Sequence, residues 1–479
     1  KQFYLSIWRW HFFAGLYVVP FILMLSLTGL LMLISPWTDN WQYGQKLIQV
    51  EAPADPNRMR ISANSQLATV IKTYPNLMPA QYVPPVDRMQ SSVFKMRGEN
   101  FSTLFVFVNP YTGEILGDFK NADRWYSIAD DIHGTLMMGS LGDLLIELSA
   151  GLMIFLVVSG LYLHWPRSRD AVRSMILPNV IIQLFRPDFL IPKNIRNVLT
   201  KEHVSRTTWK AVHASLGFYL TLFILFFAVT GLAWTGVWGQ QLVQPYSSFP
   251  EEKKASSWRS TDNSEVTHSR LNDGQLNEIP WNLEQVPLPQ STISDGDRSV
   301  GLDQIVEQGL KLNFQLSATN RFRVALPLNS RGVYTLMSIA SSRDVVNPMN
   351  DRTLHIDQYS AEVLADVRWQ DYNLVAKAMA LGIPLHKGTL GSWNILLAGL
   401  VCLLLIILSV SGFVLWWRRK PSGQLGIPRT AGISAITGGE KVMLVVGLLV
   451  AIAFPITGIA MAVLGFIDVY VWFKSKSTH

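Results

Sequence analysis

Five long apolar segments that carry almost no charge dominate this 479-residue chain. A helix needs about 20 apolar residues to cross the hydrocarbon core of a bilayer, where its amides must be satisfied internally. Only 16% of the residues are charged, which excludes a disordered or nucleic-acid-binding protein. We therefore predict five membrane-spanning helices, within residues 8–34, 141–165, 211–239, 388–417 and 442–473.

Basic residues are concentrated in two of the connections between these segments. Residues 166–210 contain nine Arg or Lys and three acidic residues, and residues 418–441 contain five and one. The two long connections, 35–140 and 240–387, are balanced or slightly acidic. The positive-inside rule then predicts a cytoplasmic N-terminus, two cytoplasmic loops and two large outer regions, which are periplasmic if the host is Gram-negative.

The chain also contains an internal repeat. The first apolar segment aligns with the third at an offset of 202, the second with the fourth at 252, and the two long polar regions align at 248. The repeated unit consists of a helix, an outer domain and a second helix. It occurs twice in the same direction and is followed by an unpaired fifth helix. The four helices of the two units are expected to form a bundle. Matching residues include His11 and His213, Gly15 and Gly217, Thr28-Gly29 and Thr230-Gly231, and Ser159-Gly160 and Ser411-Gly412.

Each outer region has the pattern of an α+β domain. Residues 62–74 and 302–312 are amphipathic, whereas 102–109 and 333–340 are rich in β-branched and aromatic residues typical of strands. Residues 244–298, rich in Ser, Pro, Asn and Asp, are predicted to be a loop or a poorly ordered insert.

Two motifs resemble a known family. The turn after the strand at 102–109 has the sequence VNPYTGEILG, which is similar to the signature of a PepSY domain. A helix that begins with His and ends with Thr-Gly, followed by one that ends SGFVLWWRR, resembles the PepSY-associated transmembrane family. Two positions of the repeat depart from the pattern: Ala361 replaces Gly113, and Trp416 replaces His164.

The resemblance implies both a fold and an activity. The implied fold is an integral membrane α-helical bundle of two helix–PepSY–helix repeats plus a fifth helix, with two extracytoplasmic PepSY-like domains. Members of the family include bacterial inner-membrane ferric-siderophore reductases of the ferrioxamine-reductase type, so the implied activity is that of a haem-dependent oxidoreductase in iron uptake.

Five of the nine His residues lie in or beside the apolar segments. Ionisable groups at membrane depth are usually functional, and two imidazoles facing each other in a helix bundle can hold a haem iron through both axial positions. The repeat pairs His11 with His213 and, after a one-residue gap, His133 with His386. We predict two b-type haems, one near each membrane face, and no covalent c-type haem because no Cys-x-x-Cys-His motif exists.

Several assignments stay open at this point. His164 is an alternative ligand of the inner haem, and any of these His residues can instead be a hydrogen-bonded interfacial residue. Gly15 and Gly217 lie one turn beyond the inner ligands, either to clear space for the macrocycle or to pack helices. Other polar residues have weaker expectations: Asp143 and Glu147 as proton relays or helix caps, and His203, His268 and His355 as solvated loop residues.

No nicotinamide, flavin or ATP motif is present, so a reductase of this kind needs an external electron donor, either a cytoplasmic flavoprotein or a quinol. The expected substrate is a ferric siderophore, docked in a cleft between the two PepSY domains, where Trp125 and Trp393 are candidate contacts. No acid–base residue is required. The alternative functions are a non-catalytic PepSY membrane protein that binds a peptide or protease partner, and a transporter component.

Overall fold

The chain forms two compact units in the computed structural model, and each is described by itself. The helical unit comprises Lys1–Leu30, Asp131–Gln240 and Gly399–His479, and the sheet unit comprises Leu31–Asp130 and Gln241–Ala398. The described residues are 2–55, 57–99, 102–165, 205–246, 267–272, 279–293, 298–420, 426 and 438–477. The predicted loop 166–210 and His203 therefore lie largely or wholly outside the described residues.

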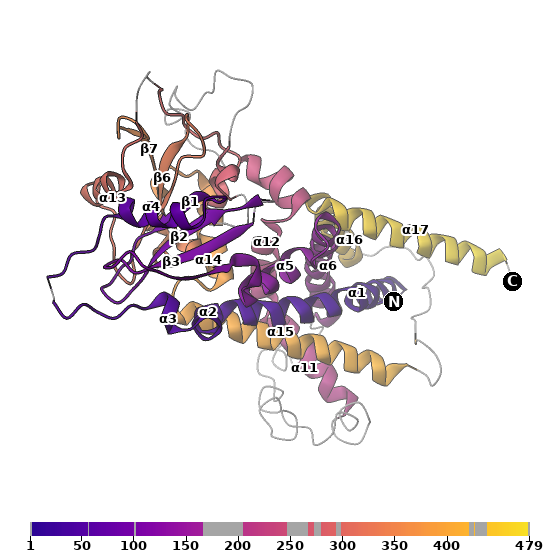
Figure 1. The fold of residues 1–479 in the computed structure, drawn as a ribbon. Helices are drawn as coiled ribbons and strands as arrows, with labels where there is room; N and C mark the ends of the chain where they lie inside the picture. The colour runs from indigo at the N-terminus through magenta and orange to yellow at the C-terminus, as the bar shows by residue number, and fades with distance from the viewer. Residues whose placement is uncertain are drawn as a thin grey trace. The chain divides into compact units, whose positions relative to one another are not determined.

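Among the described residues, three helices are long and apolar enough to cross a membrane: α1 (Gln2–Leu33), α6 (Ser140–His164) and α15 (Ser392–Arg419) (Figure 1). They correspond to the first, second and fourth predicted spans. A bent pair, α11 (Arg206–Tyr219) and α12 (Thr221–Leu232), passes the same test when its two helices are taken together.

The third span is broken, so the prediction of one continuous helix over residues 211–239 is wrong. Helices α11 and α12 meet at Leu220 with a bend of 59°. The Thr221 hydroxyl donates to the Gly217 carbonyl at 2.9 Å, and such side-chain bonds to the preceding turn bend helices. A π-helix, η3 (Gly236–Val243), follows.

The predicted fifth span, 442–473, is also wrong, because it consists of two helices. Helix α16 (Gly438–Ala453) ends just before α17 (Pro455–Ser477), and Pro455 provides the first residue of the new helix. The two helices fold back on each other: a Cβ on Gly458 would lie 2.4 Å from the Ala451 carbonyl, and one on Gly447 would lie 3.9 Å from the Met461 methyl group.

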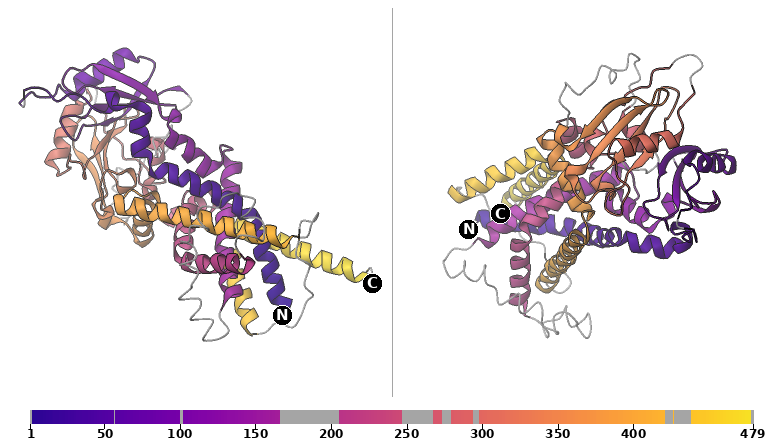
Figure 2. Two further views of the ribbon diagram at one scale, coloured as in Figure 1. Left: turned by 90° about the horizontal axis from the view of Figure 1, so that it is seen from below. Right: turned by 90° about the vertical axis from the view of Figure 1, so that its left-hand side faces the viewer.

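The sheet unit is built on a single eight-stranded antiparallel sheet, of order β4-β3-β2-β1-β5-β6-β7-β8 (Figures 1 and 2). The two repeats join through β1 and β5, where Gln81 pairs with Ala325 and Tyr82 with Val324. The expectation of two separate outer domains is therefore corrected. The strands are β1 (Met78–Val83), β2 (Ser92–Arg97), β3 (Thr103–Val108), β4 (Ile115–Lys120), β5 (Arg323–Ala325), β6 (Val333–Ser338), β7 (Arg352–Asp357) and β8 (Val363–Arg368).

One helix from each repeat covers the sheet, and both were predicted: α4 (Ala63–Thr73) and α13 (Leu302–Lys311). Their N-termini cap each other. The Asp303 carboxylate accepts from the amides of Ala63 and Asn64, while the Asn64 side chain accepts from the Leu302 amide at 2.7 Å. Side chains of both repeats, such as Phe94 and Leu354, share one buried core.

The repeat persists in backbone detail. Hairpins β3–β4 and β7–β8 shift register at equivalent places, Phe107/Val108 and His355/Ile356. The turn needs a left-handed residue, which is Gly113 (φ 76°) in the first repeat. Ala361 adopts the same conformation (φ 59°) in the second, so the departure seen in the sequence does not change the turn.

Shorter elements complete the structure. The described parts of the predicted insert 244–298 pack on the sheet, because Leu271, Ile279 and Leu283 belong to a second buried core. This part of the insert is ordered structure and not a loose loop.

The remaining elements are α2 (Ser35–Tyr43), α3 (Gln45–Ile48), η2 (Asn121–Asp123), α5 (Trp125–Thr135), η4 (Gln244–Tyr246), η7 (His268–Asn272), η8 (Trp281–Leu283), η9 (Ala340–Ser342), η10 (Pro348–Asn350), η11 (Trp369–Asp371) and α14 (Leu374–Lys387).

Candidate functional site

His11 of α1 is held by a serine of α6. Its Nδ1 lies 2.8 Å from Ser159 Oγ, and that hydroxyl donates its own proton to the Phe155 carbonyl at 2.7 Å. A hydroxyl has one proton, so while Ser159 donates it to the Phe155 carbonyl, its Oγ accepts from His11 Nδ1–H. In this arrangement a neutral His11 carries its proton on Nδ1 and has a lone pair on Nε2.

His213 of α11 has the same arrangement in the second repeat. Its Nδ1 lies 2.9 Å from Ser411 Oγ on α15, and Ser411 donates to the Leu408 carbonyl at 2.6 Å. Ser411 is the repeat equivalent of Ser159. The structure thus pairs equivalent hydroxyls with equivalent imidazoles.

His133, in the last turn of α5, repeats the pattern with a threonine. Its Nδ1 lies 2.9 Å from Thr28 Oγ1 on α1, and Thr28 donates to the Met24 carbonyl at 2.8 Å. Its Nδ1 is therefore also the protonated nitrogen in this bond.

A glycine follows each of these hydroxyl residues and faces the ring. A Cβ on Gly160 would lie 3.3 Å from His11 Cε1, and one on Gly412 would lie 3.2 Å from His213 Cε1. Gly29 faces His133 Cε1 at 3.8 Å. The glycine lets the imidazole lie close against the partner helix.

The Nε2 atoms of His11 and His213 make no hydrogen bond within the described part of the chain, and both residues are largely buried among the helices. The two residues are near enough to interact electrostatically. Among the described residues, no group of three or more His, Cys, Asp or Glu side chains that could hold a metal ion is found. Two imidazoles with lone pairs on Nε2 suit the axial positions of a haem.

The other predicted ligands are placed as follows. His386 lies in the last turn of α14, as His133 lies in the last turn of α5. Because His133 belongs to the helical unit and His386 to the sheet unit, their sharing of one haem stays a prediction. His164 is the last residue of α6, with Lys210 as its charged neighbour, and remains an alternative ligand.

The glycines predicted to face the macrocycle point at leucines. A Cβ on Gly15 would meet Leu156 at 3.9 Å, and one on Gly217 would meet Leu408 at 4.0 Å. Leu156 and Leu408 are themselves repeat equivalents. Both distances are ordinary contacts, so these glycines contribute to helix packing, and a role beside a macrocycle stays a prediction.

The two acidic residues of α6 cap the π-helix. Asp143 accepts from the Gly236 amide at 2.9 Å, and the buried Glu147 accepts from the amides of Val237 and Trp238, both at 3.1 Å. Carboxylates stabilise a helix start by accepting from its free amides. The two residues therefore act as caps, but of the π-helix and not of the entry turn of α6 as predicted.

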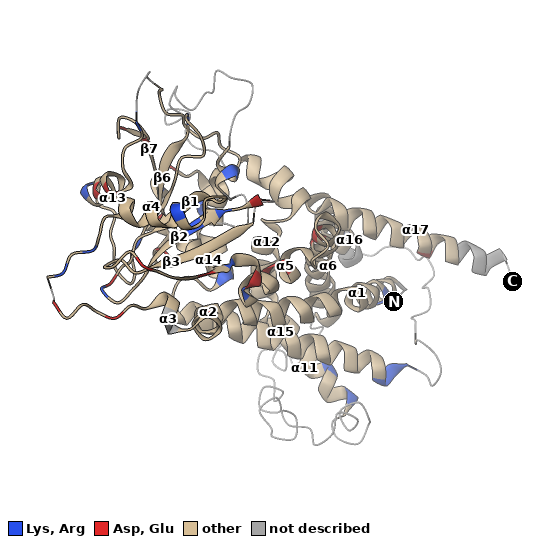
Figure 3. Ribbon diagram, viewed as in Figure 1, with Lys and Arg blue, Asp and Glu red and all other residues tan. Residues whose placement is uncertain are grey.

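Basic side chains gather at one end of the helical unit. Arg418 and Arg419 end α15, Arg206 begins α11, and the Arg418 guanidinium lies 6.0 Å from the Trp209 ring centre (Figure 3). A basic end on a bundle of apolar helices follows the pattern of the positive-inside rule.

His268 and His355 were expected to be solvated, and this is wrong. Both are fully buried in the sheet unit, with their Nε2 atoms 3.0 Å apart. His268 Nδ1 lies 2.6 Å from the Val286 carbonyl and His355 Nδ1 lies 3.0 Å from Thr335 Oγ1. Burial lowers the pKa of His268 to about 4 and that of His355 well below its usual value.

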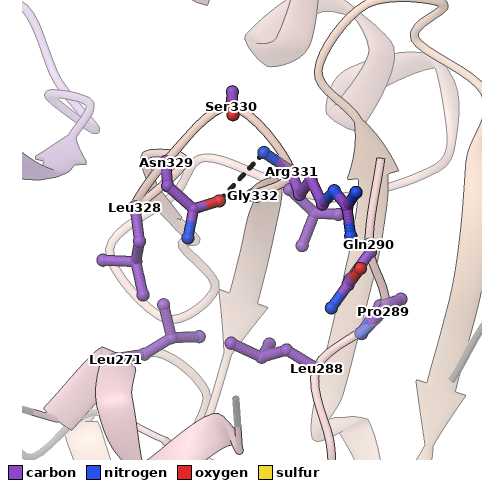
Figure 4. Close-up of a pocket in the computed structure, with 10 residues that line it drawn as sticks. Leu271, Leu288, Pro289, Gln290, Leu328, Asn329, Ser330, Arg331 and Gly332 are labelled. Carbon is purple, nitrogen blue, oxygen red and sulfur yellow. Dashed lines mark hydrogen bonds between the residues drawn. The ribbon is translucent and has the colours of Figure 1, made fainter. Parts of the chain in front are cut away.

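A pocket of about 300 Å³ lies in the second repeat of the sheet unit (Figure 4). Leu271, Leu288 and Leu328 form an apolar side, and Gln290 and Arg331 a polar side. The buried Gln358 side chain fixes the loop beside it by donating to the carbonyls of Asn329, Ser330 and Gly332.

The two repeats share a sheet and a core, so the predicted docking surface would lie on one joint unit and not between two separate domains, and docking itself stays a prediction. Trp125 and Trp393, the candidate contacts, are 37% and 55% exposed. Trp125 lies against Trp41, with ring centres 5.0 Å apart. Both tryptophans remain available to a ligand, and their contact with a substrate stays a prediction.

Comparison with known protein families now adds an independent observation. Residues 8–419 match the family described as the PepSY-associated TM region. The chain belongs to this family. No curated protein matches the chain. The chain is thus a membrane protein of the PepSY-associated family, and α16 and α17 lie beyond the matched region.

The hydroxyl residues that hold the rings were missed as functional residues. Ser159, Ser411 and Thr28 all stand out as members of the internal repeat, each followed by glycine. The sequence therefore singles out these three residues, but their role beside the histidines depends on which helix lies opposite each histidine.

Proposed function

We propose that this chain is a di-haem b-type membrane reductase that passes electrons across the bacterial inner membrane to a periplasmic ferric siderophore. The observation that carries the proposal is the matched pair His11–Ser159 and His213–Ser411, in which both rings keep a lone pair on Nε2. Packing alone does not require the same tautomer at equivalent positions of two repeats.

The residues have distinct parts in this proposal. His11 and His213 would bind the inner haem iron through Nε2, while Ser159 and Ser411 orient the rings and keep the proton on Nδ1. The hydrogen bond that Nδ1–H donates also makes the imidazole a stronger ligand through Nε2. His133, held by Thr28, and His386 would bind the outer haem. Bound haem supplies reversible one-electron transfer at the iron.

The substrate chemistry needs no acid–base side chain. One electron converts the bound Fe(III) to Fe(II), which hydroxamate and catecholate oxygens hold far less tightly, and the iron is released. The electron comes from a cytoplasmic flavoprotein or a quinol. On the periplasmic side we propose that Trp125, Trp393 and the pocket beside Arg331 contact the chelate, with polar and aromatic groups suited to a bulky ligand.

Purified protein tests the proposal directly. We expect a red protein with a Soret band and two haems per chain by pyridine haemochrome assay. His133→Ala or His386→Ala should each remove one haem and abolish reduction of ferrioxamine by the dithionite-reduced protein. A colourless protein, after expression with added haem precursor, would refute the proposal and favour a PepSY membrane protein that binds a peptide or protease partner.

Chelate recognition is tested by point variants, because the ordered part of the insert belongs to the core. Arg331→Gln and Trp393→Ala should leave haem content unchanged and alter the relative rates for several ferric chelates. Unchanged rates for every chelate would exclude these residues from recognition.

A further inference from the structure

Helix α17 is fastened to α1 directly beside the candidate ligand His11. Asp468 Oδ1 accepts from Arg9 Nε at 3.1 Å and from Arg9 Nη2 at 2.9 Å, and Asp468 Oδ2 accepts from Trp10 Nε1 at 2.8 Å. The Arg9 and Asp468 side chains are only 10% and 25% exposed. One carboxylate thus binds the two residues that precede His11 in the chain.

The same helix packs along both helices of the His11–Ser159 pair. On α1, a Cβ on Gly465 would lie 3.7 Å from the Trp10 ring, and Met461 packs against the cluster that contains Ala14. On α6, a Cβ on Gly151 would lie 1.9 Å from Thr457 Oγ1, so no larger residue fits between α6 and α17. Helix α17 therefore contacts the helix that carries the imidazole and the helix that carries its hydroxyl partner.

The second repeat lacks the residues for such a contact. At the offset that aligns His11 with His213, Arg9 and Trp10 align with Ala211 and Val212. Neither alanine nor valine has a side-chain donor for a carboxylate. The repeat thus keeps the histidine, serine and glycine, whereas the residues that bind α17 occur in one copy only.

We propose that Asp468 is a positioning residue for His11, an inference that rests on the proposed haem-binding function. An α-helix turns by 100° per residue, so fixing Arg9 and Trp10 sets both the rotation and the height of α1. His11 Nε2 is then held at one orientation about the helix axis. Helices α16 and α17, which follow the region matched by the family, thereby stabilise the inner ligand pair from one side.

The test compares Asp468→Ala and Asp468→Asn with Phe466→Ala, a control on the same helix at a side chain that is 76% exposed. Loss of a positioning partner typically weakens metal-site binding 10- to 100-fold. We expect Asp468→Ala to lose the inner haem about ten times more readily than the control. In the haem that remains, the low-spin EPR signal, which reports the relative orientation of two axial imidazoles, should shift. The outer haem should be unaffected.

A charge exchange separates positioning from general stability. The double variant Arg9→Asp/Asp468→Arg should restore part of the haem retention and of the EPR signal relative to either single variant, because it re-forms the ion pair but not the acceptor for Trp10 Nε1. If both Asp468 variants retain the inner haem as well as the wild type and with the same EPR signal, or if they lose both haems equally, the inference is overturned. His11→Ala is measured in parallel: if it retains both haems, the haem assignment itself fails, whereas loss of the inner haem there with no effect at Asp468 refutes the positioning role alone.

Discussion

The sites around His11 and His213 have the same groups in contact with the imidazole ring, but the helices that carry the two rings differ. Each ring lies within hydrogen-bond distance of a serine that donates its own proton to a backbone carbonyl, and each ring faces a glycine. The helices that carry them differ, because α1 continues unbroken to Leu33 whereas α11 ends at Tyr219 before a 59° bend. The groups that contact the imidazole are kept in both copies while the surrounding structure has diverged, which is expected where chemistry constrains only the contacting atoms.

The largest expected effect tests whether the two rings are equivalent. His11→Ala and His213→Ala should each lose the same haem, halving the haem content per chain, because an iron with two axial imidazoles needs both. External dithionite should still support chelate reduction through the outer haem. If both variants keep the full haem content and His164→Ala loses it, the ligand role belongs to His164.

The second prediction concerns a place where the sheet halves differ. The buried His355 aligns with Phe107 in the first repeat. Burial lowers the pKa of His268 from 6.5 to about 4, so between these values the unfolded chain binds a proton that the folded chain does not. Stability should therefore fall as the pH drops from about 6.5 to about 4, by up to about 3 kcal/mol at ~1.4 kcal/mol per pKa unit.

Thermal unfolding at pH 7 and at pH 4.5 measures this effect. The double variant His268→Gln/His355→Gln should show a smaller difference between the two pH values than the wild type. An equal difference in both proteins would show that other groups cause the pH dependence.

The serines provide the third prediction. Ser159→Ala and Ser411→Ala should each weaken haem binding by about 10- to 100-fold, since each removes the acceptor that orients a ring. Ser149→Ala is the matched control, because Ser149 is buried on the same helix α6 and has no histidine partner. Haem dissociation kinetics give the comparison, and equal rates in all three variants would remove the serines from the site.

The smallest effect is expected at the glycines. Gly160→Ala and Gly412→Ala place a Cβ 3.2–3.3 Å from the ring, so the imidazole must shift by a few tenths of an ångström. We expect full haem content with a shifted midpoint potential. Gly15→Ala, where a Cβ has room, should leave the potential unchanged, and a loss of haem there would instead place Gly15 beside the macrocycle.

Much of the architecture could be predicted because it depends on patterns that recur in this sequence. Apolar runs located α1, α6 and α15, and the repeat identified His11 and His213 as equivalent before any contact was known. The same repeat contained Ser159 and Ser411, but nothing in a sequence shows that Ser159 faces a histidine 148 positions earlier.

The errors have particular physical causes. At the bend near Leu220, Thr221 bonds to the Gly217 carbonyl, but Thr28 makes the same kind of bond in the unbroken α1, so the residue type alone does not mark the bend. The break at Phe454 could have been predicted, since Pro455 lies inside the apolar run. The two sheet halves meet through two residue pairs between β1 and β5 and through a shared core, and neither leaves a periodic pattern in the sequence.

That fusion has a consequence for how the chain is made. Tyr82 of β1 pairs with Val324, a residue synthesised 242 positions later, after the second and third apolar segments have been inserted. Until then β1 is an open sheet edge, which is a ready template for pairing with other chains. Contacts between such distant residues also form slowly. The first half of the sheet must therefore remain half-assembled until the second half has been made, so the supply of chaperones that cover strand edges is expected to limit the yield of this protein in cells.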